Sequence, residues 1–225
     1  MNFIIVSLIQ KASFVISYLI KNSFSENKFL KTIIVDEAVV VDVGSNVGSF
    51  IKLILNVNKK VRIYSIEPNI ELIDLQKKKF KNRKNIKFYN FAIDTKEGSR
   101  RLYLRTPASH SSFFKTHQEE KFNKIIDSAE VQTYTLEKFF DDQNINNITL
   151  LKIDIEGHDY EVFRSAKDLL LNSKIDYIKI EANQEYFEKI MTFALESNLK
   201  FLGISKSFYF KNKYNFMDIY FKNKN

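Results

Sequence analysis

Short runs of β-branched and aromatic residues alternate with amphipathic segments along most of the chain. The runs predict strands at residues 38–43, 61–66, 86–91, 149–155, 177–181, 199–205 and 216–221. The amphipathic segments predict helices at residues 46–57, 69–80, 159–171 and 185–196, and one more helix that begins at Leu136. Strands that alternate with helices require right-handed crossovers, so we predict a doubly wound α/β fold with a mostly parallel sheet.

The region between residues 95 and 135 departs from this alternation. Residues 101–104 and 131–134 are predicted to form two extra strands that pair with each other. A polar stretch at residues 107–120 lies between them and includes Ser109, His110, Ser111 and Ser112. Long loops in compact domains are usually functional or disordered. Two interpretations therefore stand: residues 109–114 cover an acceptor, or the stretch is a solvated excursion.

The N-terminal segment is mostly apolar over residues 3–20, but Ser7, Gln10, Lys11, Ser13 and Ser17 interrupt it. These interruptions argue against a buried membrane span, and a secretory signal pattern is not evident. The segment is expected to form a helix that either packs on the domain or lies on a membrane surface. We therefore expect a cytoplasmic protein, with peripheral contact at the inner face of the membrane as the second interpretation.

The amino-acid composition excludes several kinds of reactive and metal-binding site. The 225 residues include no cysteine and only three histidines, which excludes disulfides, thiolate sites and cysteine nucleophiles and argues against a multi-histidine metal site. We predict no bound metal. The formal net charge of +8 either marks an anionic partner or reflects a general abundance of lysine alongside asparagine, isoleucine and phenylalanine.

Residues 39–50 form the most informative stretch of the chain. A β-branched run leads into a turn that contains Gly44 and Gly48, and an apolar-periodic segment follows at once. This pattern predicts a buried strand, a tight loop and a helix N-terminus, where backbone N–H groups can bind a ligand. The glycines allow close approach of the backbone, and Asn46 tolerates left-handed backbone better than most residues.

Three loops are predicted to meet at the carboxyl edge of the sheet, where doubly wound folds bind ligands. They are residues 42–48, 67–68 and 154–157. Glu67 lies roughly twenty residues past the first loop, where a carboxylate either binds ribose hydroxyls or caps the next helix. The loop lacks the third glycine of a dinucleotide fingerprint and the Lys-Ser/Thr pair of a Walker loop. A cofactor with an adenosine but no phosphates fits better, and S-adenosylmethionine is such a cofactor.

Four motifs carry a resemblance to a known family. They are Val-Asp-Val-Gly-Ser-Asn-Val-Gly-Ser at residues 41–49, Ile-Glu-Pro-Asn at 66–69, Asn-Phe-Ala-Ile at 90–93 and Leu-Lys-Ile-Asp-Ile-Glu-Gly-His-Asp at 151–159. Together they resemble the FkbM-type methyltransferases, and the resemblance extends over residues 39–181. It implies the Rossmann-like class I methyltransferase fold, with a seven-stranded sheet whose last strand is antiparallel. It also implies S-adenosylmethionine-dependent O-methylation of sugars, glycans or other natural products.

The resemblance also implies site residues. Asp42, Gly44, Ser45, Asn46 and Gly48 would hold the methionine end of the cofactor, Glu67 with Pro68 the ribose, and Asn90, Phe91 and Ala92 the adenine, while Asp154 would sit beside the reactive methyl group. We accordingly divide the chain into a helical extension, residues 1–35, and a methyltransferase domain, residues 36–225.

Methyl transfer to an alcohol needs in-line geometry and removal of a proton. Asp154, Glu156 and His158 are the catalytic candidates, and strand alternation puts the first two on the same side. Three interpretations stay open: Asp154 is the base, His158 is the base, or the site positions the reactants without a base. His158 could also serve only to cap the following helix or to pack.

Two other functions compete with O-methylation of a small molecule or glycan. The basic balance and the lysine-aromatic tail at residues 208–214 favour an RNA methyltransferase. Against it, Asp154-Ile155-Glu156-Gly157 has neither the proline nor the aromatic residue that amino-directed nucleic-acid enzymes place after this strand, so a nucleic-acid partner is disfavoured. The intact Asp42, Glu67 and Asp154 argue against a non-catalytic, membrane-associated binding protein of the same fold.

Overall fold

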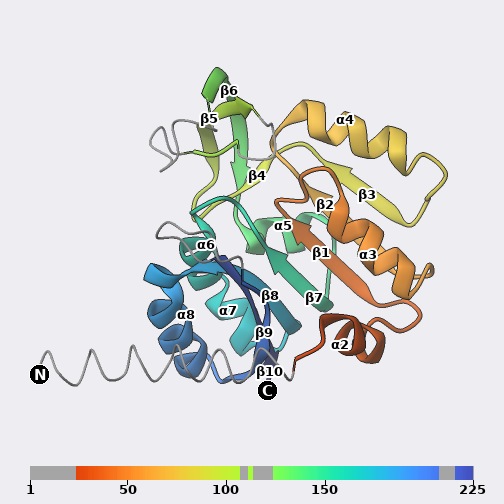
Figure 1. Ribbon diagram of the computed structural model, residues 1–225, viewed down its shortest axis with the longest axis vertical. Coiled ribbons are helices and arrows are strands. Elements are labelled where there is room, and N and C mark those ends of the chain that lie inside the picture. The colour runs from red at the N-terminus through yellow and green to blue at the C-terminus, as the bar shows by residue number, and fades with distance from the viewer. Residues whose placement is uncertain (1–23, 107–110, 114–123, 208–215, 225) are drawn as a thin grey trace, which may run out of the picture.

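The computed structural model describes residues 24–106, 111–113, 124–207 and 216–224 (Figure 1). Three sequence predictions fall wholly or partly outside these residues. They are the helix at residues 3–20, most of the polar stretch at residues 107–120, and the lysine-aromatic tail at residues 208–214. None of the helices in these described residues has the length and the apolar composition that a membrane span requires.

The main sheet has seven strands in the order β3-β2-β1-β7-β8-β10-β9. These are β1 (Val39–Val43), β2 (Arg62–Ile66), β3 (Ile86–Tyr89), β7 (Ile148–Ile153), β8 (Ile175–Asn183), β9 (Leu199–Ser207) and β10 (Phe216–Asn223). Neighbours from β3 through β8 pair in parallel, whereas β10 runs antiparallel to both β8 and β9. The predicted α/β fold is therefore confirmed, including the antiparallel last strand.

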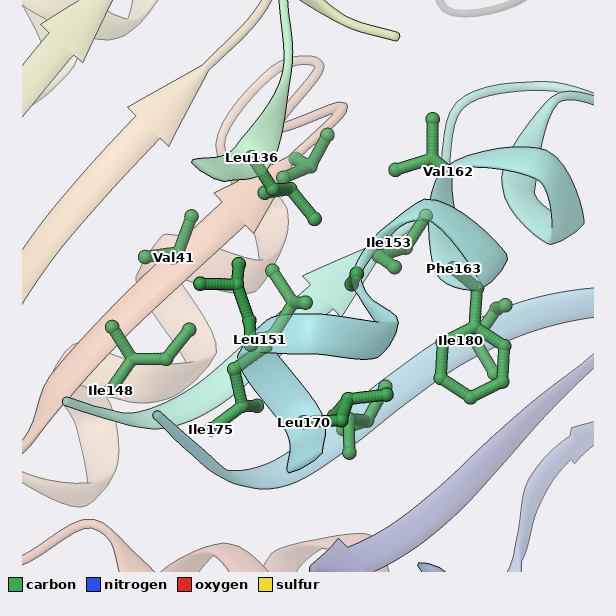
Figure 2. Close-up of a cluster of buried hydrophobic side chains, with 14 of the residues drawn as sticks. Val41, Leu136, Ile148, Leu151, Ile153, Val162, Phe163, Leu170, Ile175 and Ile180 are labelled. Carbon is green, nitrogen blue, oxygen red and sulfur yellow. The ribbon is translucent and has the colours of Figure 1, made fainter. Parts of the chain in front are cut away.

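Helices cover both faces of this sheet (Figure 1). They are α2 (Glu26–Ile33), α3 (Ser49–Val57), α4 (Ile70–Lys79), α5 (Leu136–Asp142), α6 (Asp159–Ser165), α7 (Lys167–Leu171) and α8 (Gln184–Glu196). Alternate residues of β1 enter different cores: Val41 packs with Leu136 and Phe163 of the α5–α8 layer, whereas Val40 packs with Leu30 and Ile54 of the other layer. Figure 2 shows the first of these cores. Burial on both faces explains why β1 reads as a continuous β-branched run.

Local signals decide where several helices begin and end. The Asn69 side chain accepts a hydrogen bond from the Glu71 N–H at 3.0 Å, so the predicted cap of α4 is confirmed. The first predicted helix starts at Ser49 rather than residue 46, because Gly48 has a left-handed backbone with φ of 73°. The helix predicted over residues 159–171 is divided at Ala166 into α6 and α7.

A second, three-stranded sheet has the order β4-β6-β5 and consists of β4 (Ala92–Ile93), β5 (Gly98–Thr106) and β6 (Lys124–Tyr134). The predicted pairing of two extra strands is confirmed, and it is antiparallel. Both strands are longer than predicted, so residues 131–133 face residues 98–100. The short β4 pairs in parallel with β6 and was not predicted. The β5–β6 hairpin projects beyond the main sheet (Figure 1).

Candidate active site

The loop after β1 turns sharply and contacts the end of β7. The Gly44 N–H donates to the Ile66 carbonyl at 3.0 Å, and the Ser45 N–H donates to the same oxygen at 3.1 Å. Gly44 has φ of 75°, and a Cβ there would lie 1.8 Å from the Asp154 carbonyl oxygen. Glycine is therefore required both by the backbone angle and by the close approach of the neighbouring strand. Asn46 has φ of 52°, the left-handed conformation that its residue type tolerates.

Glu67 joins this loop to the end of β2. Its Oε2 accepts the Asn46 N–H at 2.9 Å and its Oε1 accepts the Asn69 N–H at 2.9 Å. Burial raises the pKa of Glu67 to about 7, and the two backbone donors oppose that rise. Because each carboxylate oxygen has a second lone pair, Glu67 can also accept hydrogen bonds from ribose hydroxyls. The alternative interpretation, that Glu67 caps the next helix, is correct in part, since its carboxylate accepts the N–H of Asn69, the residue that caps α4.

These loops border a space of about 560 Å³ at the carboxyl ends of β1, β2 and β7, which we call the central cleft. It is lined by Val43, Gly44, Asn46, Ile66, Glu67, Pro68, Leu72, Phe91, Ala92, Ile93, Leu102, Ser111, Ser112, Phe113, Asp154, Ile155 and Glu156. A cleft with apolar walls and a few convergent polar groups is typical of a small-molecule site. The described part of the polar stretch, residues 111–113, is one of its walls.

The cleft brings together seven of the predicted cofactor residues: Gly44, Asn46, Glu67, Pro68, Phe91, Ala92 and Asp154. Asp42, Ser45, Gly48 and Asn90 do not line it. The Ser45 hydroxyl is buried 2.8 Å from Ser65 Oγ and 2.9 Å from Gln76 Nε2. The Asn90 side chain donates to the Pro68 carbonyl at 2.8 Å. Asn90 is therefore bonded to a wall residue of the cleft, whereas the Ser45 hydroxyl belongs to the interior.

Lys152 is a site residue that the sequence analysis missed. Its buried Nζ lies 2.9 Å from Asp42 Oδ1, 3.3 Å from Asp154 Oδ2 and 3.0 Å from the Gly44 carbonyl. Burial favours the neutral amine, but attraction to Asp154 and Asp42 is stronger and raises the pKa of Lys152. A lysine inside the apolar run at residues 148–153 was the signal available in the sequence, because a lysine in a buried strand needs a carboxylate partner.

Asp154 and Glu156 both line the central cleft, but strand alternation is not the reason. The strand predicted to reach residue 155 ends at Ile153, Ile155 lines the cleft as well, and Glu156 has a left-handed backbone with φ of 56°. The Asp154 side chain is 25% exposed. Burial, together with repulsion from Asp154 and Asp159, raises the pKa of Glu156 to about 8. The loop between them is fixed by Asp159, whose carboxylate accepts the N–H groups of Ile155 at 2.8 Å and Gly157 at 3.0 Å.

His158, the third catalytic candidate, is not among the described residues that line the cleft. Its Nε2 lies 2.8 Å from Asp94 Oδ1, and Arg100 Nη1 lies 2.7 Å from Asp94 Oδ2. Burial raises the pKa of Asp94, but hydrogen bonds from Arg100 and His158 outweigh it and the net shift is downward. The Arg100 guanidinium lies 4.3 Å from the ring centroid of Phe113, which does line the cleft. His158 therefore belongs to a polar cluster behind the wall.

Residues 42–205 match the family described as the methyltransferase FkbM domain. The chain matches none of the curated proteins with which it was compared.

Solved structures with the same fold include three methyltransferases of low sequence identity. TrmK of M. capricolum, determined with S-adenosyl-homocysteine, has a TM-score of 0.53 at 13% identity, with 89% of this chain and 69% of that chain covered. An rRNA methylase from Streptococcus thermophilus has a TM-score of 0.52 at 9% identity and coverage of 88% and 93%. A precorrin-6y C5,15-methyltransferase from Geobacter metallireducens GS-15 has a TM-score of 0.50 at 10% identity and coverage of 88% and 87%.

The family match covers most of the chain, and the cleft lies where this fold binds its cofactor. Glu67 brings a carboxyl group to the cleft, Leu72, Phe91 and Ala92 form an apolar wall, and no lysine or arginine is among the described residues that line it. The chain belongs to the FkbM methyltransferase domain family and is an S-adenosylmethionine-dependent methyltransferase.

Proposed function

We propose that this enzyme methylates a hydroxyl group of a sugar, a glycan or another small natural product. The observation that carries the proposal is the pair of carboxyl groups, Asp154 and Glu156, on the wall of the central cleft next to the buried Lys152. When bound, S-adenosylmethionine supplies a methyl group on a positively charged sulfur. The residues of this chain must then orient the acceptor oxygen and take its proton.

Glu67, Gly44 and Asn46 would hold the cofactor at the β1 and β2 ends of the cleft. Glu67 is already oriented by the N–H groups of Asn46 and Asn69, so its oxygens are in place before the ribose arrives. Phe91, Ala92 and Leu72 would enclose the adenine. The remaining wall, formed by residues 154–156, is then the one that faces the reactive end.

Asp154 is the proposed base. The Asp154 carboxylate lies 3.3 Å from the Lys152 ammonium, and its exposed part can accept the proton of an acceptor hydroxyl. Glu156, whose pKa is raised to about 8, is mostly protonated at neutral pH, so it can donate a hydrogen bond to the acceptor and leaves Asp154 as the proton acceptor. His158 is proposed to act through Asp94 and Arg100 on the position of Phe113, outside the reacting atoms.

The electrostatics of the site favour a small acceptor over RNA. The structures of similar fold include both an rRNA methylase and a precorrin methyltransferase, and fold likeness at this identity does not transfer an acceptor. The chain has a formal charge of +8, but the described residues that line the central cleft include no lysine or arginine, whereas Glu67, Asp154 and Glu156 are among them. Such a lining offers a phosphodiester backbone no cation to neutralise its charge.

Two measurements test the proposal. Labelled S-adenosylmethionine should transfer its methyl group to sugar-containing extracts and leave RNA unlabelled; labelling of RNA alone would overturn the hydroxyl assignment. Asp154→Asn should lower kcat by roughly 10²- to 10⁴-fold, the usual contribution of a general base, while calorimetry shows nearly unchanged cofactor affinity. His158→Gln is the comparison. If it lowers kcat as much as Asp154→Asn, the imidazole is the base.

The proposal includes a cytoplasmic protein whose residues 3–20 form a helix on the domain or on the membrane. Liposome flotation of the full chain and of a chain that lacks residues 1–23 distinguishes the two. Ser25 stays in the shortened chain because its side chain caps α2. Flotation that disappears on truncation identifies the membrane contact, and absence of flotation in both favours packing on the domain.

A further inference from the structure

A second cavity lies beside the central cleft, at the carboxyl ends of β7 and β8. It is open to solvent, comprises about 290 Å³ of space, and is lined by Gly157, Asp159, Tyr160, Glu181, Ala182, Asn183, Tyr186, Ile190 and Phe216. We call it the side cavity. A hollow on which aromatic side chains and a few polar groups converge is typical of a ligand site.

The two spaces share one partition, the loop at residues 154–157. Asp154, Ile155 and Glu156 line the central cleft, whereas the next residue, Gly157, lines the side cavity. Asp159 holds this loop from the side-cavity end by accepting the N–H groups of Ile155 and Gly157. A molecule in the side cavity therefore lies next to the carboxylates that face the reactive end of the cofactor site.

The walls of the side cavity combine aromatic rings with a carboxyl group. Tyr160 and Tyr186 lie with ring centroids 6.1 Å apart and planes tilted by 31°, and Ile190 and Phe216 add apolar surface. Among the described residues, Glu181 finds no hydrogen-bond or ion-pair partner for its half-buried carboxyl group. A half-buried carboxyl without a protein partner is stabilised when a ligand supplies the hydrogen bond.

This combination suits a ring that has an apolar face and polar edges. The C–H face of a sugar ring packs against tyrosine rings, and its hydroxyls can bond to a carboxyl group and to the tyrosine hydroxyls. Burial, together with repulsion from Asp154, Asp159 and Glu156, raises the pKa of Glu181. An anionic ring suits the cavity poorly, because two carboxyl groups, Asp159 and Glu181, line it and would repel a negative charge. A further negative charge would increase that repulsion.

We propose that the side cavity binds the acceptor as an uncharged sugar ring, stacked on Tyr160 and Tyr186 and hydrogen-bonded to Glu181. This inference rests on the proposed methylation of a hydroxyl, and it adds the location and the charge class of the acceptor. The ring would enter from the β8 and α8 side and present one hydroxyl across the 154–157 loop to Asp154.

The test uses the full chain loaded with S-adenosyl-homocysteine and a panel of methyl glycosides of neutral hexoses, with the matching uronic acids. Saturation-transfer NMR should detect binding of at least one neutral glycoside and weaker binding of its uronate. Tyr186→Ala and Glu181→Ala should each weaken glycoside binding by about tenfold or more, which corresponds to about 1.4 kcal/mol. Tyr186→Phe keeps the aromatic ring, so it should lose less glycoside affinity than Tyr186→Ala.

Glu188→Ala is the matched control, because Glu188 is an exposed carboxylate on the same helix and does not line the cavity. Cofactor affinity and melting temperature of each variant, measured in parallel, show whether the variant is folded. Equal binding by Tyr186→Ala and wild type, preference for uronates, or no binding by any neutral glycoside would each overturn the proposal.

The outcomes also separate this inference from the proposed function. Methyl transfer to a sugar by Tyr186→Ala with the wild-type KM would refute acceptor binding in the side cavity. It would leave the proposed O-methyltransferase activity standing. Glycoside binding that depends on Tyr186, combined with methyl transfer only to RNA, would refute the proposed function instead.

Discussion

The ammonium group of Lys152 lies 2.9 Å from Oδ1 of Asp42, and both side chains are buried between β1 and β7. The two residues are register partners on these neighbouring parallel strands. The same ammonium group also reaches the Gly44 carbonyl and the Asp154 carboxylate. One buried cation thus connects the loop that is proposed to hold the cofactor with the proposed base.

Lys152→Met should destabilise the fold by about 3–5 kcal/mol, because it leaves the Asp42 carboxylate buried and unpaired. Urea unfolding followed by circular dichroism measures the loss. Lys138→Met is the control, since Lys138 makes an exposed ion pair with Asp142 and should change stability by at most about 1 kcal/mol. The double variant with Asp42→Asn should recover part of the stability. Equal effects of the two lysine variants would contradict the pairing argument.

Glu67→Gln should weaken S-adenosylmethionine binding by about 10- to 100-fold. The reason is that a charged acceptor contributes about 1.5–3 kcal/mol to a hydrogen bond, and glutamine turns one acceptor oxygen into a donor that faces a backbone N–H. Calorimetry of the full chain gives the dissociation constant. Glu71→Gln, on the exposed first turn of α4, should leave it unchanged. An unaltered constant in Glu67→Gln would show that the ribose is held elsewhere.

Gly44→Ala and Gly98→Ala form a matched pair of backbone tests. Both glycines have positive φ, 75° and 145°, but only at Gly44 would the added Cβ meet backbone, 1.8 Å from the Asp154 carbonyl oxygen. At Gly98 the nearest atom would be 4.0 Å away. Gly98→Ala should lower the free energy of unfolding by about 1–3 kcal/mol, from backbone strain alone. Gly44→Ala should lower the free energy of unfolding clearly more and abolish cofactor binding. Similar losses for the two variants in urea unfolding would refute the close approach of Gly44 to the Asp154 carbonyl.

The free energy of unfolding without cofactor should fall as the pH rises from about 5 to 8. The pKa of Glu67 and of Asp159 is raised to about 7, and that of Glu156 to about 8, so the folded chain binds more protons than the unfolded chain in this range. Glu156→Gln should flatten this decrease by on the order of 2 kcal/mol, after a discount for partial exposure.

Urea unfolding at several pH values provides the measurement for this last prediction. Glu188→Gln is the control, because its exposed carboxyl should leave the slope as it is in the wild type. A free energy of unfolding that rises over the same pH interval would show that these carboxyl groups are stabilised as anions in the folded chain.

Much of the fold could be predicted from the sequence because its signals are local. Apolar periodicity identifies the strands, and the Asn69 cap and the glycines of the β1 loop appear in the sequence as residue types with specific backbone preferences. The break at Ala166 was missed, because residues 159–171 have a continuous helical pattern. The two-residue β4 was missed because it is too short to show a period.

The candidate site was predicted less completely. Loop position correctly indicated that Glu67, Asp154 and Glu156 reach one cleft, since all three lie at the carboxyl edge of the sheet. Ser45 lies in the same loop as Asn46, yet its side chain turns toward Gln76 in the interior. Proximity along the chain does not determine which side of a loop a residue faces, because the packing beneath the loop decides it.

Local patterns in the sequence were enough to predict the strand–loop–helix units, the special backbone of the loop after β1 and the family, because each depends on neighbours within a few residues. Which distant residues meet depends on the tertiary structure. The pairing of Asp42 with Lys152, the placement of His158 against Asp94 and the side cavity between β8 and α8 all depend on strand register and helix packing. These features are set when two apolar faces are buried together, and no local pattern encodes that choice.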